Sequence, residues 1–237
     1  MLTVTRNKMQ LIHPICEDIV SHKEDFKQHK IVLTGSDSFL VETDHGVIIK
    51  RQDMRTTREE ADTILVQQVA WVMAKKVLVV ADDTDIFVLL LHFCCQGDIS
   101  ASTTVLMILP IHGCTMSDIS ATVHQYRPII SNLMAAHGLT GYDTVTTYFG
   151  IGKAAALRIL RTGAHTVANL GDTNCDLSEV ISQATPFILA CYGQDGCTSM
   201  TETRKKMWTS KVGRSVASTP KLASLTPTNQ AFHGNVA

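Results

Sequence analysis

The sequence predicts an α/β fold with a mainly parallel sheet, followed by a C-terminal helical region. A continuous apolar, β-branched run at residues 77–80 is typical of a buried parallel strand. A helical repeat of apolar residues precedes this run at residues 58–75. After residue 116 the pattern changes to helical segments. These observations indicate a sheet-containing part followed by a helical part.

Two short strands are predicted before the long helix, at residues 30–34 and 47–50. Asp44-His45-Gly46 is a good tight turn before the second strand. The helix at residues 58–75 has Thr57 as a candidate N-cap and Glu60 three positions later, which is a capping-box pattern.

Three aspartates, Asp82, Asp83 and Asp85, follow the predicted strand at 77–80. A helix is predicted to begin at residues 86–93, and a further strand at 103–109, closed by Pro110. In open α/β sheets ligands bind beyond the carboxyl ends of strands, and the aspartates fall at such a place.

The second half favours helices at residues 117–136, 154–160 and 177–192, with an interruption at Pro128 and a kink at Pro186. The last forty or so residues are rich in Ser, Thr, Pro and Lys, and we expect them to be loosely ordered.

The composition of 45% hydrophobic and 18% charged residues over 237 positions predicts a folded protein. The longest apolar stretch, residues 86–95, is too short to span a bilayer. The N-terminus lacks the apolar core of a secretory signal, so an intracellular location is the default expectation. Seven cysteines without a Cys-x-x-Cys pair suggest buried or free thiols rather than disulfides or a zinc finger.

The net charge of −1 is low for a nucleic-acid binder, but the charges are unevenly distributed. Residues 59–85 are acidic and the C-terminal stretch is basic, with Arg204, Lys205, Lys206, Lys211, Arg214 and Lys221. This polarity suits a polyanion lying across a metal site, and equally a solvated basic tail.

Five acids, namely Glu60, Asp62, Asp83, Asp85 and Asp143, supply enough hard oxygen ligands for one or two Mg²⁺ or Mn²⁺ ions. Each has a structural alternative. Glu60 and Asp62 also favour a helix N-terminus, and Asp143 also suits a turn. The aspartates after the strand are harder to explain without a cation or solvent, because they repel one another. Nearby His137 is expected to be structural or on the surface.

Gly150-Ile151-Gly152-Lys153 forms a turn before a helix. Backbone amides at the start of that helix would point at a phosphate group, and Lys153 would add charge. The alternative is a loop between packed helices, where glycine serves only close approach.

In this order the motifs resemble the flap-endonuclease branch of the PIN-like nuclease superfamily, over about residues 58–160. The wider run also resembles largely uncharacterised animal proteins of suggested mobile-element origin. The resemblance implies a PIN-like three-layer α/β/α sandwich with a C-terminal helix-hairpin-helix region. It divides the chain into a partial nuclease domain at 1–115, a helical region at 116–195 and a basic tail at 196–237.

The N-terminal part departs from the family pattern, which begins with a strand ending in a metal-binding aspartate. Asp37 and Asp44 are candidates for the unmatched acids only by proximity. The chain is therefore expected to be N-terminally truncated or to have an incomplete metal site. A missing strand would leave a hydrophobic sheet edge exposed to aggregation or to a partner.

The leading functional hypothesis is a metal-dependent endonuclease. Asp83, Asp85 and Asp143 would hold the ions with Glu60 and Asp62, and Gly150, Gly152 and Lys153 would bind the nucleic acid, with DNA favoured over RNA and the nucleus as one candidate compartment. The second is a catalytically inactive nucleic-acid-binding or interaction module. A phosphatase with an Asp-x-Asp nucleophile ranks well below both.

Overall fold

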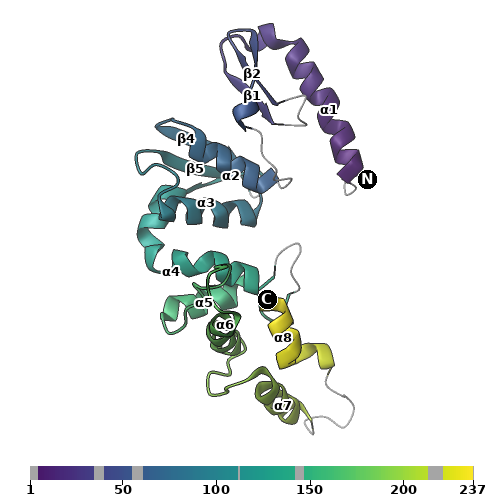
Figure 1. Cartoon of the computed structure of the whole chain (residues 1–237), viewed down its shortest axis with the longest axis vertical. Coiled ribbons are helices and arrows are strands. Elements are labelled where there is room, and N and C mark those ends of the chain that lie inside the picture. The colour runs from purple at the N-terminus through teal and green to yellow at the C-terminus, as the bar shows by residue number, and fades with distance from the viewer. Residues whose placement is uncertain are drawn as a thin grey trace. The chain divides into compact units, whose positions relative to one another are not determined.

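The computed structural model describes residues 5–34, 40–54, 61–111, 113–141, 147–212 and 221–236. The chain divides into two compact units, residues 1–60 and 61–237 (Figure 1). The described residues form a mixed α/β structure with eight α-helices and two three-stranded sheets, one antiparallel and one mixed.

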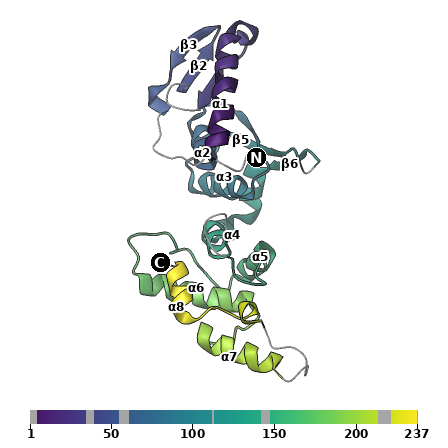
Figure 2. The same ribbon diagram turned by 90° about the vertical axis from the view of Figure 1, so that its right-hand side faces the viewer.

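The first unit combines a long helix with the antiparallel sheet, which is ordered β1-β2-β3. Its elements are α1 (Thr5–Ser21), η1 (Lys23–Phe26), β1 (Ile31–Thr34), β2 (Leu40–Asp44), β3 (Val47–Lys50) and η3 (Gln52–Met54). The helix α1 runs alongside the sheet in both ribbon views (Figures 1 and 2). The predictions of β1 and β3 are confirmed, whereas α1 and β2 were not predicted.

The predicted turn joins β2 to β3. Asp44 pairs with Val47, so His45 and Gly46 alone make the loop, and both have positive φ, 49° and 77°. This conformation matches the right-handed twist of a hairpin. A Cβ atom on Gly46 would lie 2.9 Å from Glu24 Oε1, so glycine also serves close packing here. The tight turn is therefore confirmed.

A buried carboxylate on β2 links two cationic side chains in the first unit. Glu42 on β2 is 5% exposed and bonds Lys30 Nζ at 2.7 Å and the Arg51 guanidinium. Arg51 also bonds Asp53, with Nη2 2.7 Å from Oδ2. The hydrogen bond from Lys30, followed by that from Arg51, lowers the pKa of Glu42. A buried charge is tolerated only with such partners.

The second unit begins with α2 (Ala61–Trp71) and α3 (Thr84–Gln96), which pack against a sheet of β4 (Lys76–Val80), β5 (Thr104–Leu109) and β6 (Thr115–Asp118). The order is β4-β5-β6, with β4 and β5 parallel and β6 antiparallel to β5. The strands predicted at 77–80 and 103–109 and the helix after the aspartates are confirmed.

A mainly parallel sheet is not shown by the described residues. After β5 the chain turns at Gly113 and Cys114, which have φ of 71° and 55°. These left-handed residues reverse the chain, so β6 returns antiparallel to β5. No such strand was predicted after Pro110.

The helix α2 is shorter than predicted. It ends at Trp71 rather than at residue 75, because the following residues must turn into β4. The Thr103 hydroxyl donates to the Ala74 carbonyl at 3.0 Å and fixes this connection against the sheet. The predicted capping residues Thr57 and Glu60 lie outside the described residues.

The helical part consists of α4 (Ile119–Leu139), α5 (Lys153–Thr162), α6 (Leu177–Cys191), α7 (Met200–Lys211), η4 (Leu222–Ser224) and α8 (Asn229–Val236). The interruption expected at Pro128 is present, since Tyr126 within α4 has non-helical angles of φ −115° and ψ 17°. The helix α6 continues through Pro186.

The second unit contains two hydrophobic cores. One joins the sheet to α2, α3 and α4, with Leu90 and Met107 fully buried. The other joins α4, α5, α6 and α8, with Phe187 and Phe232 fully buried. Leu133 of α4 packs against both. The predicted boundaries at residues 115 and 195 both fall inside this unit.

The C-terminal stretch differs from the loosely ordered tail that we expected, because α7 and α8 pack onto the helical core. Two of its basic side chains donate to backbone carbonyls. Arg204 donates to the Thr226 carbonyl, and Lys211 Nζ lies 3.1 Å from the Ser224 carbonyl oxygen. These bonds and the burial of side chains give the C-terminal stretch a regular structure, although its composition is polar.

Two expectations about the whole chain are tested by the described residues. None of the described helices has the length and apolar character needed to cross a membrane. All seven cysteines are free thiols, as predicted, and Cys94 and Cys191 are buried enough for their pKa to rise to about 11.

We expect Glu42→Gln to lower the free energy of unfolding of the first unit at pH 7 by about 1–3 kcal/mol, because it weakens charge-assisted bonds. The folded pKa of Glu42 lies below its ordinary value of 4.5, so its stabilisation is complete above that pH. The stabilisation is lost as the pH falls through the folded pKa. The variant should lack this acid-dependent loss.

Both tryptophans, Trp71 and Trp208, lie in the second unit, so amide hydrogen exchange of β2 is the suitable measurement. Glu17→Gln is the control, because Glu17 is exposed and pairs with His13 at the surface. Equal effects of the two substitutions would show that the Glu42 cluster does not hold the unit together.

Candidate functional site

The candidate site begins where β4 ends. Asp83 is the N-cap of α3, and its Oδ1 accepts a hydrogen bond from the Asp85 amide at 2.8 Å. This cap follows from the sequence, because aspartate before a helical run satisfies an otherwise free amide. The fold thus brings Asp83 and Asp85 together in the first turn of one helix.

Asp82 has a structural role at the same place. Its two carboxylate oxygens lie 3.1 and 2.9 Å from the Ile111 amide nitrogen. This bond ties the end of β4 to the segment that follows β5. The pairing of the two strands also extends by one step, from the Ala81 amide to the Ile108 carbonyl at 3.1 Å. Asp82 therefore closes the carboxyl end of the parallel pair.

Asp85 contacts a residue far away in the sequence. Its Oδ1 lies 2.7 Å from Nε2 of His137, 52 positions later, near the end of α4. The side chain of His137 is only 11% exposed and that of Asp85 is 28% exposed. A structural role for His137 was one of the two expectations, but its partner was not predicted, since no local spacing signals a pair so far apart.

Lys153 binds the backbone at the end of α4. Its Nζ donates to the His137 carbonyl at 2.9 Å and to the Gly141 carbonyl. Burial lowers the pKa of Lys153, and the nearby negative charge of Asp85 acts in the opposite direction. Cationic side chains commonly satisfy the free carbonyls at a helix C-terminus in this way.

The segment that contains the predicted ligand Asp143 starts and ends at this place. Gly141 has φ of 91°, and a Cβ atom there would lie 2.4 Å from Thr147 Cγ2. Residues 141 and 147 are therefore in close contact, with Asp143 between them in the sequence. Asp143 itself lies outside the described residues.

The other predicted ligands have different positions. Asp62 is half-buried in the first turn of α2, which packs against α3. Glu60 lies outside the described residues. Within the described ranges, no three acidic, histidine or cysteine side chains are grouped so that they could hold a metal ion. Oxygen ligands such as Asp83 and Asp85 suit Mg²⁺ or Mn²⁺, and Mg²⁺ commonly keeps several waters beside one or two carboxylates.

The glycine turn before α5 has exposed glycines and a buried anchor. Gly150 has φ of 78°, Gly152 is the N-cap of α5, and both are exposed, whereas Ile151 is 5% exposed in the helical core. Gly152 has no side chain that could cap the helix. The amides at the start of α5 thus lie at the surface, while the Lys153 side chain points to the end of α4.

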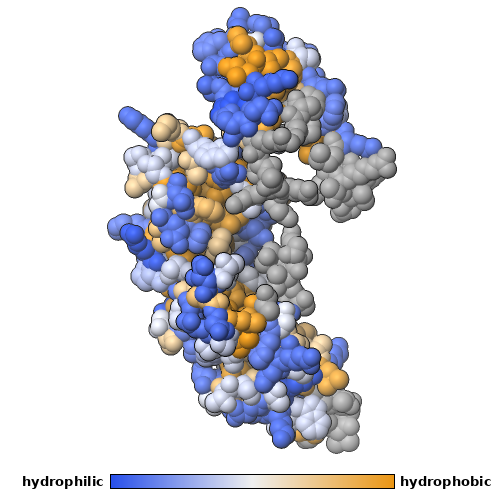
Figure 3. Space-filling view, viewed as in Figure 1, coloured by the Kyte–Doolittle hydropathy of each residue, from blue (hydrophilic) through white to orange (hydrophobic). Residues whose placement is uncertain are grey.

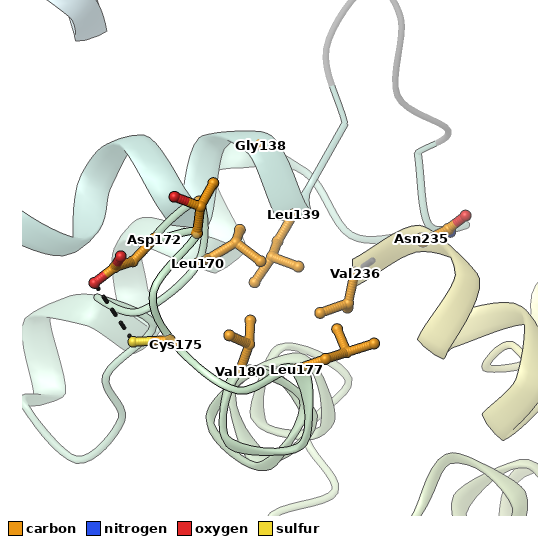
Figure 4. Close-up of a pocket in the computed structure, with 11 residues that line it drawn as sticks. Gly138, Leu139, Leu170, Asp172, Cys175, Leu177, Val180, Asn235 and Val236 are labelled. Atoms are coloured by element: carbon orange, nitrogen blue, oxygen red, sulfur yellow. Dashed lines mark hydrogen bonds between the residues drawn. The ribbon is translucent and has the colours of Figure 1, made fainter.

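A cavity of about 380 Å³ lies elsewhere in the helical part, between the end of α4, residues 170–175, α6 and α8 (Figure 4). Leu139, Leu170, Leu177, Val180 and Val236 give it a largely apolar wall. Cys175 Sγ donates to Asp172 at 3.5 Å on one side. Asp62, Asp83 and Asp85, which are the predicted acidic ligands in the described part of the chain, do not line this cavity.

In comparisons with known proteins, the chain matches no protein-family model, no curated protein and no solved structure. The relationship to PIN-like nucleases therefore stays a proposal that rests on the motifs and on the geometry described above.

We expect Lys153→Met to lower the free energy of unfolding by about 1–2 kcal/mol, because it leaves two carbonyls at the end of α4 without their charged donor. Urea unfolding followed by circular dichroism measures this change. Arg158→Met in the same helix is the control, since Arg158 is exposed. A loss no larger than that of the control would mean that the Lys153 bonds do not stabilise this end of α4.

Proposed function

We propose that the chain is a nuclease-like protein related to the flap-endonuclease branch of the PIN-like superfamily, which hydrolyses phosphodiester bonds with Mg²⁺ or Mn²⁺. The observation that carries this proposal is the contact between Asp85 and His137. It fixes the end of α4, and with it the start of the segment containing Asp143, beside the acids that follow β4.

In this proposal Asp83, Asp85 and Asp143 hold the ions together with Glu60 and Asp62. Such an ion, when bound, lowers the pKa of a water ligand and stabilises negative charge on phosphate oxygens. His137 orients the Asp85 carboxylate through their hydrogen bond, as outer partners of metal ligands commonly do. Lys153 holds the end of α4 in place.

The proposed PIN-like fold is a three-layer sandwich with helices on both faces of a mainly parallel sheet. The described part of the second unit supplies one helical layer, because α2, α3 and α4 pack against Val79, Val105 and Met107. The opposite face of β4 has Leu78 and Val80 exposed. A complete sandwich therefore requires further layers of structure beyond those described.

The nucleic acid would bind at the start of α5, where exposed amides meet the positive end of the helix dipole. The glycines at 150 and 152 let a phosphate approach closely. We propose DNA rather than RNA as the substrate, which suits an intracellular, nuclear location. The bonds of Lys153 to carbonyls favour a supporting role for its side chain over direct phosphate contact.

The test is cleavage of labelled flap, single-stranded DNA and RNA substrates in Mn²⁺ and in Mg²⁺, against EDTA. We expect Asp85→Asn to lower the rate about 100-fold or more, because it removes a charged ligand. It should also weaken Mn²⁺ binding in calorimetry. Asp98→Asn, which makes the same change at an exposed position after α3, should leave both unchanged.

Cleavage that persists equally in Asp85→Asn would point to a contaminating nuclease. Absence of both Mn²⁺ binding and cleavage in a folded protein would contradict the enzymatic proposal.

A second candidate function is a nucleic-acid-binding module without catalysis. The exposed start of α5 favours it, since this helix start needs no ion to bind phosphate. DNA binding without metal dependence would distinguish this function from the first.

We expect Gly152→Asp to weaken DNA binding several-fold, because it places a negative charge where phosphate would lie. Gly152 has φ of −110°, and nothing lies within 4 Å of a Cβ atom there, so the chain should fold normally. Aspartate as N-cap should even stabilise α5 by a few tenths of a kcal/mol. Fluorescence anisotropy with labelled DNA measures the binding.

The matched control is Gly152→Asn, which caps the helix without the charge. Equal affinities of the two variants would exclude phosphate binding at this helix start.

A further inference from the structure

The strand β4 forms a free edge of the mixed sheet. Among the described residues it pairs only with β5. The Lys75 carbonyl accepts from the Thr104 amide at 2.9 Å, and the Ala81 amide donates to the Ile108 carbonyl at 3.1 Å. Because backbone groups alternate in direction along a strand, the odd-numbered residues face β5. The amides and carbonyls of Lys76, Leu78 and Val80 consequently point to the free edge.

The side chains of the same residues lie on an uncovered face. Leu78 is 52% exposed and Val80 is 61% exposed, whereas Val79, on the face toward the helices, is 4% exposed. In the next strands Ile108 is the partner of Val80, and Met116, which is 60% exposed, is the partner of Ile108. The edge therefore joins unpaired backbone groups to an exposed apolar surface, a combination that favours strand addition.

The charges along this edge are arranged symmetrically. Lys75 and Lys76 precede the apolar residues 77–81, and Asp82 and Asp83 follow them. Both lysines are exposed, Asp82 is half-buried and Asp83 is exposed. In an antiparallel copy the order is reversed, so the two aspartates of one copy lie opposite the two lysines of the other. The segment is thus complementary to an antiparallel copy of itself.

We propose that β4 pairs antiparallel with β4 of a second copy of the chain, which joins the two mixed sheets into one sheet. The outward-facing residues must be opposite each other, so even-numbered residues pair with even-numbered ones. Among these registers, the charges select the one with Lys76 opposite Asp82 of the second copy. Leu78 is then opposite Val80 of the second copy, and Val79 lies on the twofold axis.

This register brings the exposed side chains together. The Leu78 and Val80 side chains of both copies form one apolar row, flanked at each end by a lysine and an aspartate. The Asp82 carboxylate, although bonded to the Ile111 amide, retains lone pairs for a lysine. Two short strands make a small interface, so the dimer should be weak, with dissociation in the micromolar range or above. Asp82 is not a proposed metal ligand, so the inference is independent of catalysis.

Sedimentation equilibrium over a wide range of protein concentration should show a mass rising from 25.9 kDa toward twice that value. We expect Leu78→Pro to weaken the dimer about tenfold or more, because it removes an amide that points outward. The substitution leaves the hydrogen bonds to β5 in place, as proline does on edge strands. Circular dichroism checks that the variant is folded.

The charge register is tested by exchange of the two charges. Lys76→Asp and Asp82→Lys should each weaken the dimer, and the double variant should restore it, because both cross-strand pairs form again in reverse. The loss of the bond to Ile111 is common to Asp82→Lys and the double variant. The difference between these two variants therefore reports the contact between copies and not the stability of the chain.

Zero-length carbodiimide cross-linking of a mixture of ¹⁵N-labelled and unlabelled protein locates the contact directly in the unmodified chain. An amide between Lys76 of one copy and Asp82 of the other should appear with mixed labelling. A protein that stays monomeric at every concentration overturns the proposal. So does a dimer that is insensitive to Leu78→Pro and to the charge exchange, because it would use another surface.

Discussion

The helix α4 must belong to two hydrophobic cores at once, and the arrangement of the second unit depends on this constraint. Ile119 and Ile130 of this helix lie in the core of the sheet, and Ala136 and Leu139 near its end lie in the helical core. The same constraint carries His137 to Asp85, because a helix held at both ends fixes the side chains at its terminus.

Local signals in the sequence predicted the elements that bury simple apolar patterns. The strands β4 and β5 are continuous apolar runs, and the turn at His45 and Gly46 follows from the conformational freedom of glycine. The strand β2 escaped prediction, because its central Glu42 is buried by two cations that come from other segments. A glutamate is normally exposed, and only the tertiary partners of Glu42 account for its burial.

The C-terminal helices α7 and α8 also escaped prediction, because their order depends on distant partners. The helix α7 buries little more than Met200 and Thr203, so its apolar periodicity is too weak to be recognised. Its order depends on Phe232 in α8 and on bonds from Arg204 and Lys211 to distant carbonyls. Figure 3 shows that hydrophobic residues also reach the surface, as do Val47, Ile48 and Ile49 of β3 in the first unit. The apolar run of β3 thus predicted its strand correctly although the strand is exposed.

For the candidate site, the sequence predicted the residue types and their local positions but not their partners. Asp83 and Asp85 follow a strand as expected, and Gly152 opens a helix as expected. The pairing of Asp85 with His137 joins elements that only the packing of α3 on α4 brings together. Lys153 was expected to add charge beside a phosphate, and that role stays a prediction. Its donation to two carbonyls at the end of α4 had no signal in the sequence.

The contrast between the two sheets has a consequence for how the chain reaches its structure during synthesis. In the first unit Ile31 pairs with Thr43 and Asp44 with Val47, so every strand pairing joins near neighbours. In the second unit Lys76 pairs with Thr104, and the helical core includes Phe232. These contacts join residues that are far apart in the sequence. Contacts of short sequence separation form early and distant ones late. The antiparallel sheet of β1, β2 and β3 can thus fold on the ribosome before β5 has been synthesised to pair with β4.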